Sequence, residues 1–209
     1  RFFRFIGQFI ISDIKNENIF DIERLKFLKR TSLFIGSTFF ITMLGGILFG
    51  RYNFKTKNIN LKLDNWSSKL KDFKIVQISD LHLGSFSSVK KLEDVVEIIN
   101  NEKPDIVVFT GDLVNNFHNE ALPYISTLKK IKSNYGNYSV LGNHDYCDYV
   151  GWKRSSKKWK NNFNEMQEVH RKMGFNLLLN SSKQIKIGED KINLVGVENW
   201  GAGNFNKDG

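Results

Sequence analysis

The sequence contains almost no cysteine. Among its 209 residues the only one is Cys147, which excludes an internal disulfide framework in any compartment. Internal repeats and low-complexity tracts are also lacking. Hydrophobic residues make up 41% and charged residues 25% of the chain, so it can bury a core and is not disordered throughout. We interpret the net charge of +9 as lysine scattered over solvated faces, and we expect no nucleic-acid binding.

Residues 31–50 lack charged side chains altogether. A helix needs about 20 residues to cross the hydrocarbon core of a bilayer. Glycine, present here at positions 36, 45 and 46, is commoner in membrane helices than in soluble ones. We therefore predict a transmembrane helix at 31–50, with a buried core helix as the alternative. Residues 1–30 would be a cytoplasmic or interfacial segment, and residues 51–72 a linker or edge strand.

The charges that flank this run do not fix its orientation, because four basic residues lie within 15 positions on each side. The stretch ERLKFLKR at 23–30 resembles a twin-arginine export signal, with Leu25 in place of the second arginine. We therefore expect a membrane-bound protein whose domain works on the extracytoplasmic side. Because the chain starts at Arg1 and not at methionine, we also expect it to be a fragment.

From residue 73 onward, short apolar runs alternate with stretches of helical spacing. Such alternation is typical of βαβ units and an α/β fold, with a largely parallel sheet covered on both faces. We predict strands at 73–79, 105–110, 138–142, 175–179, 183–187 and 191–197, and helices at 87–102, 119–133 and 156–173.

Polar clusters follow the first three predicted strands. The first holds Asp80 and His82, the second Asp112, and the third the run Asn143-His144-Asp145. Asp112 lies 32 residues after Asp80, and Asn143 lies 31 residues after Asp112. Each interval is about one βαβ step, so the clusters should meet at the carboxyl edge of the sheet, where α/β proteins place their sites.

Aspartate, histidine and asparagine together form a mixed oxygen and nitrogen ligand set. Such a set is typical of a site for divalent manganese, iron or zinc, and it differs from a site built of cysteine thiolates. Other candidates carry less weight. We interpret His118 as a solvated loop residue, His170 as a surface residue and Cys147 as a packed small side chain.

The motifs DLHLG, GDLV and GNHD occur in that order, and in this the chain resembles the calcineurin-like metallophosphoesterases. The resemblance covers residues 70–200. It is closest to the membrane-associated bacterial branch, which includes proteins similar to UDP-2,3-diacylglucosamine hydrolases. It implies a layered sandwich of mixed β-sheets flanked by helices, and residues 73–209 would form the N-terminal part of that domain.

The family's roles carry over onto the matching positions. The resemblance implies two divalent metal ions, the first held by Asp80 and His82, with Asp112 bridging both and Asn143 on the second. It makes His144 the catalytic histidine facing the leaving group, and Asp145 the residue that orients His144. Family members add downstream histidines, usually in a G-H-x-H motif, which we expect beyond Gly209.

The resemblance further implies hydrolysis of a phosphodiester, phosphomonoester or pyrophosphate. The expected substrate is lipid-linked or nucleotide-linked, since a membrane tether would favour such a substrate. With so few ligands we expect this chain alone to turn over little. Two alternatives stay open, a non-catalytic membrane scaffold and a nuclease of the same superfamily. Glu198 and Trp200 could lie at the rim of the site or serve as core and loop residues.

Overall fold

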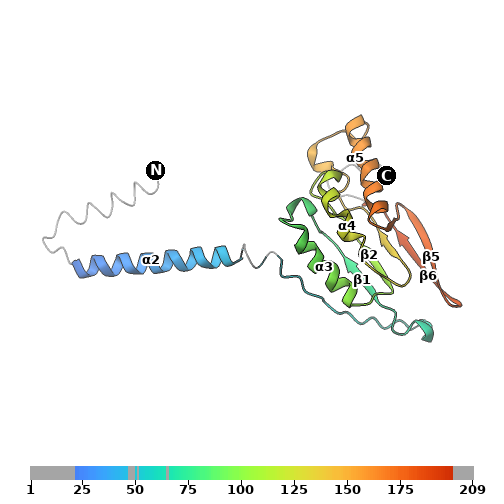
Figure 1. Cartoon of the computed structure of the whole chain (residues 1–209), viewed down its shortest axis with the longest axis horizontal. Helices are drawn as coiled ribbons and strands as arrows, with labels where there is room; N and C mark the ends of the chain where they lie inside the picture. Colours follow the sequence, from blue (N-terminus) through green and yellow to red (C-terminus); the bar gives the residue numbers. More distant parts are fainter. Residues whose placement is uncertain (1–21, 47–49, 51, 65, 200–209) are drawn as a thin grey trace. The chain divides into compact units, whose positions relative to one another are not determined.

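The computed structural model describes residues 22–46, 50, 52–64 and 66–199, and the chain divides into two compact units, residues 1–54 and 55–209. Helices are labelled α, 3-10 helices η and strands β (Figure 1). In chain order the elements are α2 (Ile22–Gly45), η2 (Ser68–Leu70), β1 (Ile75–Ile78), η3 (Leu83–Ser85), α3 (Val89–Asn101), β2 (Ile106–Phe109), η4 (His118–Tyr124), α4 (Ile125–Leu128), β3 (Asn137–Ser139), η5 (Asp148–Val150), α5 (Lys157–Lys172), β4 (Phe175–Leu177), β5 (Ser181–Ile187) and β6 (Asp190–Gly196).

Helix α2 belongs to the first unit. It starts nine residues before the uncharged run, and those nine residues include five charged side chains, so only 31–45 of the helix is uncharged. A membrane span requires about 20 predominantly apolar residues. Among the described residues, no helix is long and apolar enough to cross a membrane. The predicted span at 31–50 is therefore not supported; its residues 47–49 lie outside the described part.

The second unit is built on a parallel sheet with the strand order β1-β2-β3-β4. Neighbouring strands pair in parallel along the whole sheet, for example Ile75 with Ile106 and Val107 with Asn137. Residues of α3, η4, α4 and α5 share one core with the sheet, so these helices gather on one face. The α/β class predicted from the alternating pattern is confirmed.

Strand β2 shows how both faces of this sheet are covered. Val107 and Phe109 pack in a large core with residues of α3, η4, α4 and α5, whereas Ile106 packs on the other side with Leu178 and Ile185. That second face is covered by the antiparallel hairpin of β5 and β6 (Figure 1). The parallel sheet and the hairpin together give the mixed strand arrangement that the resemblance implied.

Two predicted elements differ from the observed ones. The helix expected at 119–133 is a 3-10 helix followed by one α-helical turn, because Pro123 inside it has no backbone N–H to donate. The strand expected at 138–142 ends at Ser139, and the chain then forms the loop that carries Asn143, His144 and Asp145. In residues 52–64 and 66–72, the described part of the segment 51–72, no strand forms.

His170 is buried, so its prediction as a surface residue is wrong. The apolar residues of α5 recur at helical spacing, and His170 falls on that face beside Met166 and Val169. Its Nδ1 lies 3.0 Å from the Ser139 Oγ on β3, and its Nε2 has no hydrogen-bond partner in the described part of the chain. Burial lowers the pKa of His170 to about 3. The flanking lysine and arginine residues occupy the other face of the helix.

This buried histidine should make the fold sensitive to acid. The unfolded state binds a proton near pH 6.5, whereas folded His170 stays neutral down to about pH 3. Stability is therefore fully present above pH 6.5 and falls as the pH drops towards 3, by about 2 kcal/mol between pH 7 and pH 5. Urea unfolding in EDTA at both pH values should show this extra loss in the wild type relative to His170→Gln. Parallel pH dependences in the two proteins would contradict the assignment.

Candidate metal centre

The site lies where the first three strands of the sheet end. The backbone ladder continues past them, because Asp80 N–H donates to the Gly111 carbonyl at 3.0 Å and His82 N–H donates to the Asp112 carbonyl at 3.1 Å. These bonds align the loop after β1 with the loop after β2. The convergence expected from the strand spacing is thus what the structure shows.

Three of the predicted ligands have left-handed backbone: Asp80, His82 and Asp112 have φ values of 55°, 46° and 58°. This conformation costs a residue other than glycine about 1–2 kcal/mol. Such strain concentrates at functional sites, where the surrounding structure enforces it.

Glycines 111 and 142 let the second and third loops cross at close range. A Cβ atom on Gly111 would lie 2.3 Å from the backbone nitrogen of Gly142, and one on Gly142 would lie 2.3 Å from Asp112 Oδ1. Neither distance is possible for a real Cβ atom. The glycine of the GD motif and that of the GNHD motif are therefore required because the two loops approach each other so closely that neither position has room for a side chain.

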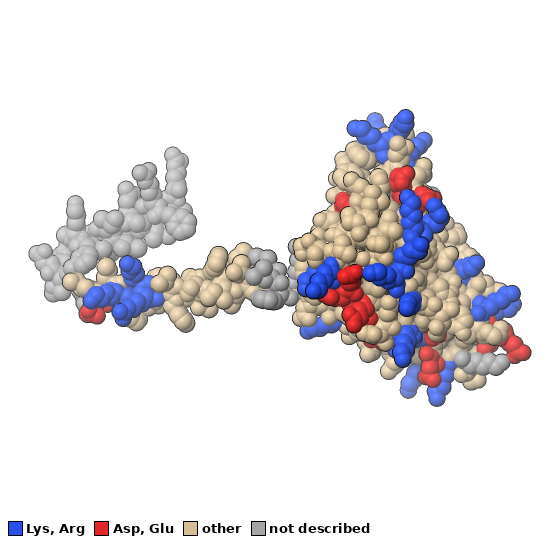
Figure 2. All heavy atoms as spheres, viewed as in Figure 1, with Lys and Arg blue, Asp and Glu red and all other residues tan. Residues whose placement is uncertain are grey.

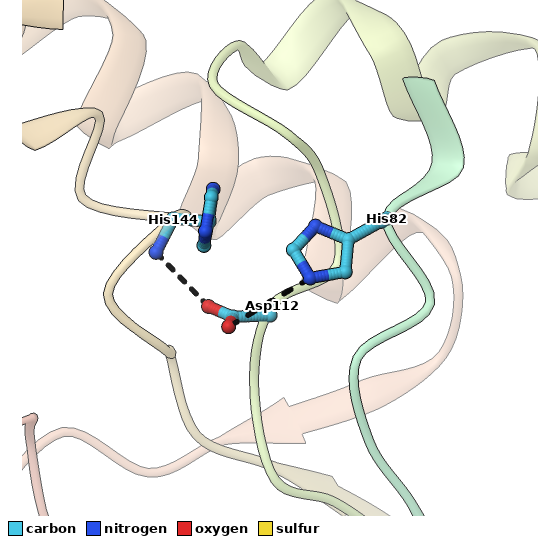
Figure 3. Close-up of side chains that lie close together, drawn as sticks. All are labelled: His82, Asp112 and His144. Carbon is cyan, nitrogen blue, oxygen red and sulfur yellow. Dashed lines mark hydrogen bonds and ion pairs between the residues drawn. The ribbon is translucent and has the colours of Figure 1, made fainter. Parts of the chain in front are cut away.

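The structure brings three predicted site residues into one cluster: His82, Asp112 and His144 (Figure 3). One ligand atom from each lies within 4.8 Å of the others. His82 Nε2 is 4.0 Å from Asp112 Oδ2, and the two imidazole rings meet edge to face with centroids 4.6 Å apart. Nitrogen and oxygen atoms at this spacing can share one divalent cation, whose bonds to them are about 2.0–2.2 Å long.

Asp80 and Asn143 stand at the margin of this cluster. Asp80 Oδ1 is 3.9 Å from His82 Nε2, which is close enough for both to reach one cation, while its other oxygen accepts a hydrogen bond from Ser79. The Asn143 Nδ2 donates to the Tyr149 hydroxyl at 2.6 Å. Both predicted ligands therefore lie beside the site, but they do not belong to the group formed by His82, Asp112 and His144.

Asp145 has a different role from the one implied by the resemblance. Its carboxylate is fully buried and accepts backbone N–H groups from Asp112 at 2.9 Å, Leu113 at 2.8 Å, Val114 at 3.3 Å and Gly142 at 3.0 Å. Burial raises the pKa of this carboxyl to about 7, and the charge of Asp112 also raises it, while the backbone N–H groups lower it. Asp145 thus clamps the second loop to the third and does not hold the His144 ring.

The His144 ring is held by Asn115 instead. Its Nδ1 lies 2.7 Å from the Asn115 carbonyl oxygen, which can only accept, so Nδ1 carries the proton and Nε2 carries the lone pair. Loop 115–117 is itself fixed by Glu120, whose carboxylate accepts the backbone N–H groups of Asn115, Asn116 and Phe117 at 2.7–3.0 Å. In the sequence, this loop could be recognised from Glu120, a glutamate in the first turn of the helix that follows, which is where a capping box has its glutamate.

The remaining candidates lie outside the cluster. His118 donates through its backbone N–H and its ring to Asn162, so it serves to anchor η4 on α5. Cys147 is buried, and burial raises the pKa of its thiol to about 11, in line with the predicted packing role. Glu198 accepts a hydrogen bond from Tyr146 and interacts with Asn180, while Trp200 lies outside the described residues.

Replacing Asp145 by asparagine tests the clamp. Each carboxylate oxygen accepts two backbone N–H groups, so either orientation of the new amide leaves two buried donors without an acceptor. Each such donor costs about 1–3 kcal/mol. We expect urea unfolding of the metal-free protein to show a loss of about 2 kcal/mol or more in the free energy of unfolding.

The matched control for this variant is Asp112→Asn. The amide oxygen of that variant can still accept the His144 N–H, which donates to Asp112 Oδ1 at 2.9 Å in the wild type. The free energy of unfolding should therefore change by less than about 1 kcal/mol. If Asp145→Asn were as stable as Asp112→Asn, the carboxylate would not be a clamp.

Known proteins resemble parts of this chain. It is 41% identical over 81 residues to YkuE, an uncharacterized metallophosphoesterase of Bacillus subtilis, covering 37% of this chain and 28% of that protein. It is 31% identical over 135 residues to an uncharacterized metallophosphoesterase of Helicobacter pylori, covering 61% and 36%. A zebrafish (Danio rerio) protein described as a transmembrane protein with a metallophosphoesterase domain is 28% identical over 149 residues, covering 69% and 31%.

The chain spans about a quarter to a third of the length of these curated relatives. The narrower resemblance to UDP-2,3-diacylglucosamine hydrolases stays a prediction. The sequence model of the calcineurin-like phosphoesterases matches residues 73–208, which is most of the chain and all of the site. The chain therefore belongs to the calcineurin-like phosphoesterase family.

Proposed function

We propose that this protein is a metal-dependent phosphoesterase that hydrolyses a phosphodiester, a phosphomonoester or a pyrophosphate. The observation that carries the proposal is the convergence of His82, Asp112 and His144 within 4.8 Å at the carboxyl edge of the parallel sheet. Family membership supports the reaction class, because the calcineurin-like family is typically dependent on two metal ions.

The donor atoms fit divalent cations. Asp80, His82 and Asp112 would hold the first ion, and Asp112 together with Asn143 would hold the second. Nitrogen and carboxylate or amide oxygen donors without a thiolate favour manganese, iron or zinc. Two bound cations would lower the pKa of a water between them and neutralise the phosphoryl oxygens as charge develops.

His144 is the proposed proton donor to the leaving oxygen. Because Asn115 fixes the proton on Nδ1, only Nε2 can take up and release a second proton. The edge contact with His82 places the ring beside the proposed metal ligands. A histidine in this position can protonate a departing alkoxide as the phosphorus–oxygen bond breaks.

The proposed substrate class is a lipid-linked or nucleotide-linked phosphate ester. Residues 55–209 hold 23 Lys and Arg against 18 Asp and Glu, a net charge of +5, which supports an anionic substrate, since a positive field raises the encounter rate of anions. On the visible face of residues 55–199, Lys and Arg are interspersed with acidic side chains (Figure 2). That pattern favours a small anionic substrate over a nucleic acid, which would fit a continuous basic stripe.

The direct test is hydrolysis of bis-p-nitrophenyl phosphate by the protein in its full-length form. We expect turnover to require added Mn²⁺, to stop in EDTA and to fall by at least about 100-fold in Asp112→Asn, since a metal ligand matters more than its outer-shell partners. The matched control is Asp94→Asn, which removes an exposed aspartate of α3 and should leave the rate unchanged.

Two outcomes would replace this proposal. A folded protein that binds Mn²⁺ and hydrolyses no phosphate ester would be the non-catalytic scaffold. Cleavage of DNA with a steep salt dependence would identify a nuclease, because each phosphate contact adds to the salt slope.

A further inference from the structure

Tyr149 lies against two of the predicted site residues. Its ring packs on the His144 ring with centroids 4.5 Å apart and an angle of 30° between the planes. Its hydroxyl oxygen accepts the Asn143 Nδ2–H at 2.6 Å. The side chain is 51% exposed, so the hydrophobic core does not account for its position.

The hydrogen bond to Tyr149 occupies the nitrogen end of the Asn143 amide. A cation can bind only the oxygen of an amide group, because the nitrogen has no available lone pair. With Nδ2 donating to Tyr149, Oδ1 is the end left for another partner. In the described part of the chain, no hydrogen bond occupies this Oδ1.

The turn that carries Tyr149 is braced from both sides. The Asp148 carboxylate binds the Arg154 guanidinium through two contacts, at 2.8 and 3.3 Å, and both side chains are largely buried. The Arg154 guanidinium in turn lies 5.1 Å from the centroid of the Tyr146 ring and 5.7 Å from that of Trp159. Cation–π contacts of this kind add to the ion pair, so η5 holds Tyr149 in a defined place.

We propose that Tyr149 is a positioning residue of the metal centre. Its oxygen holds the nitrogen end of the Asn143 amide, so that Oδ1 would be the end available to the second metal ion, and its ring packs against the His144 imidazole. This inference rests on the proposed function, because it assigns a role in the same site. Tyr149 acts through its two neighbours and need not touch the substrate.

The test separates the hydroxyl from the ring. Tyr149→Phe removes only the hydrogen bond, Tyr149→Ala removes the ring as well, and Tyr135→Phe is the matched control at a partly exposed tyrosine that packs on Phe73, away from the site. Mn²⁺ binding by the full-length protein is measured by titration calorimetry, alongside hydrolysis of bis-p-nitrophenyl phosphate over a range of Mn²⁺ concentrations.

In Tyr149→Phe we expect the affinity for the second Mn²⁺ to fall by about 10-fold, with the first unchanged, as is typical when a partner of a metal ligand is removed. Saturating Mn²⁺ should restore kcat in Tyr149→Phe and fail to restore it in Tyr149→Ala. Nuclear magnetic resonance of the metal-free protein should show the Asn143 side-chain amide shifting towards solvent-exposed values in both variants, but not in Tyr135→Phe.

Wild-type affinity for both ions in Tyr149→Phe, together with an unshifted Asn143 amide, would overturn the positioning role and leave the proposed phosphoesterase intact. A wild-type protein that binds no Mn²⁺ would overturn both proposals. The two failures are therefore distinguishable.

Discussion

The buried carboxylate of Asp145 accepts four backbone N–H groups, and the arrangement of the candidate metal centre depends on these bonds. Three of the donors belong to Asp112, Leu113 and Val114 in the loop after β2, and the fourth to Gly142 in the loop after β3. A buried charge is costly unless hydrogen bonds replace its hydration. Here the backbone provides them, so the second and third loops are fixed as one unit before any cation binds.

A second carboxylate, that of Glu120, also accepts several backbone N–H groups. These belong to loop 115–117, and the Asn115 carbonyl of that loop fixes the tautomer of His144. Tyr149, which follows the Asp148 that pairs with Arg154, packs its ring on the same histidine. The site is thus surrounded by residues that act on the ligands and on their loops, which is how a protein gives metal ligands a fixed geometry.

The fold leaves one edge of the sheet available for this site. With the helices on one face and the β5–β6 hairpin on the other, the carboxyl edge is where the strand ends are free to carry polar loops. The strand spacing alone was enough to predict that the loops carrying Asp80, Asp112 and Asn143 would come together there, and His82, Asp112 and His144 of these loops do so. It could not predict that Pro123 would reduce the helix at 119–133, or that the buried stripe of α5 would include His170.

The sequence by itself determined the α/β class and the meeting of three motifs, because strand periodicity and motif order are local properties of the chain; the ligand set stays a prediction. Two Asp-Tyr pairs three residues apart, Asp145-Tyr146 and Asp148-Tyr149, show what the sequence does not determine. The Asp145 carboxylate is buried and accepts backbone N–H groups, whereas the Asp148 carboxylate binds Arg154, although each aspartate precedes a tyrosine. Only the tertiary structure decided between them, since a carboxylate's role depends on which backbone N–H groups and charges the fold brings within 3 Å.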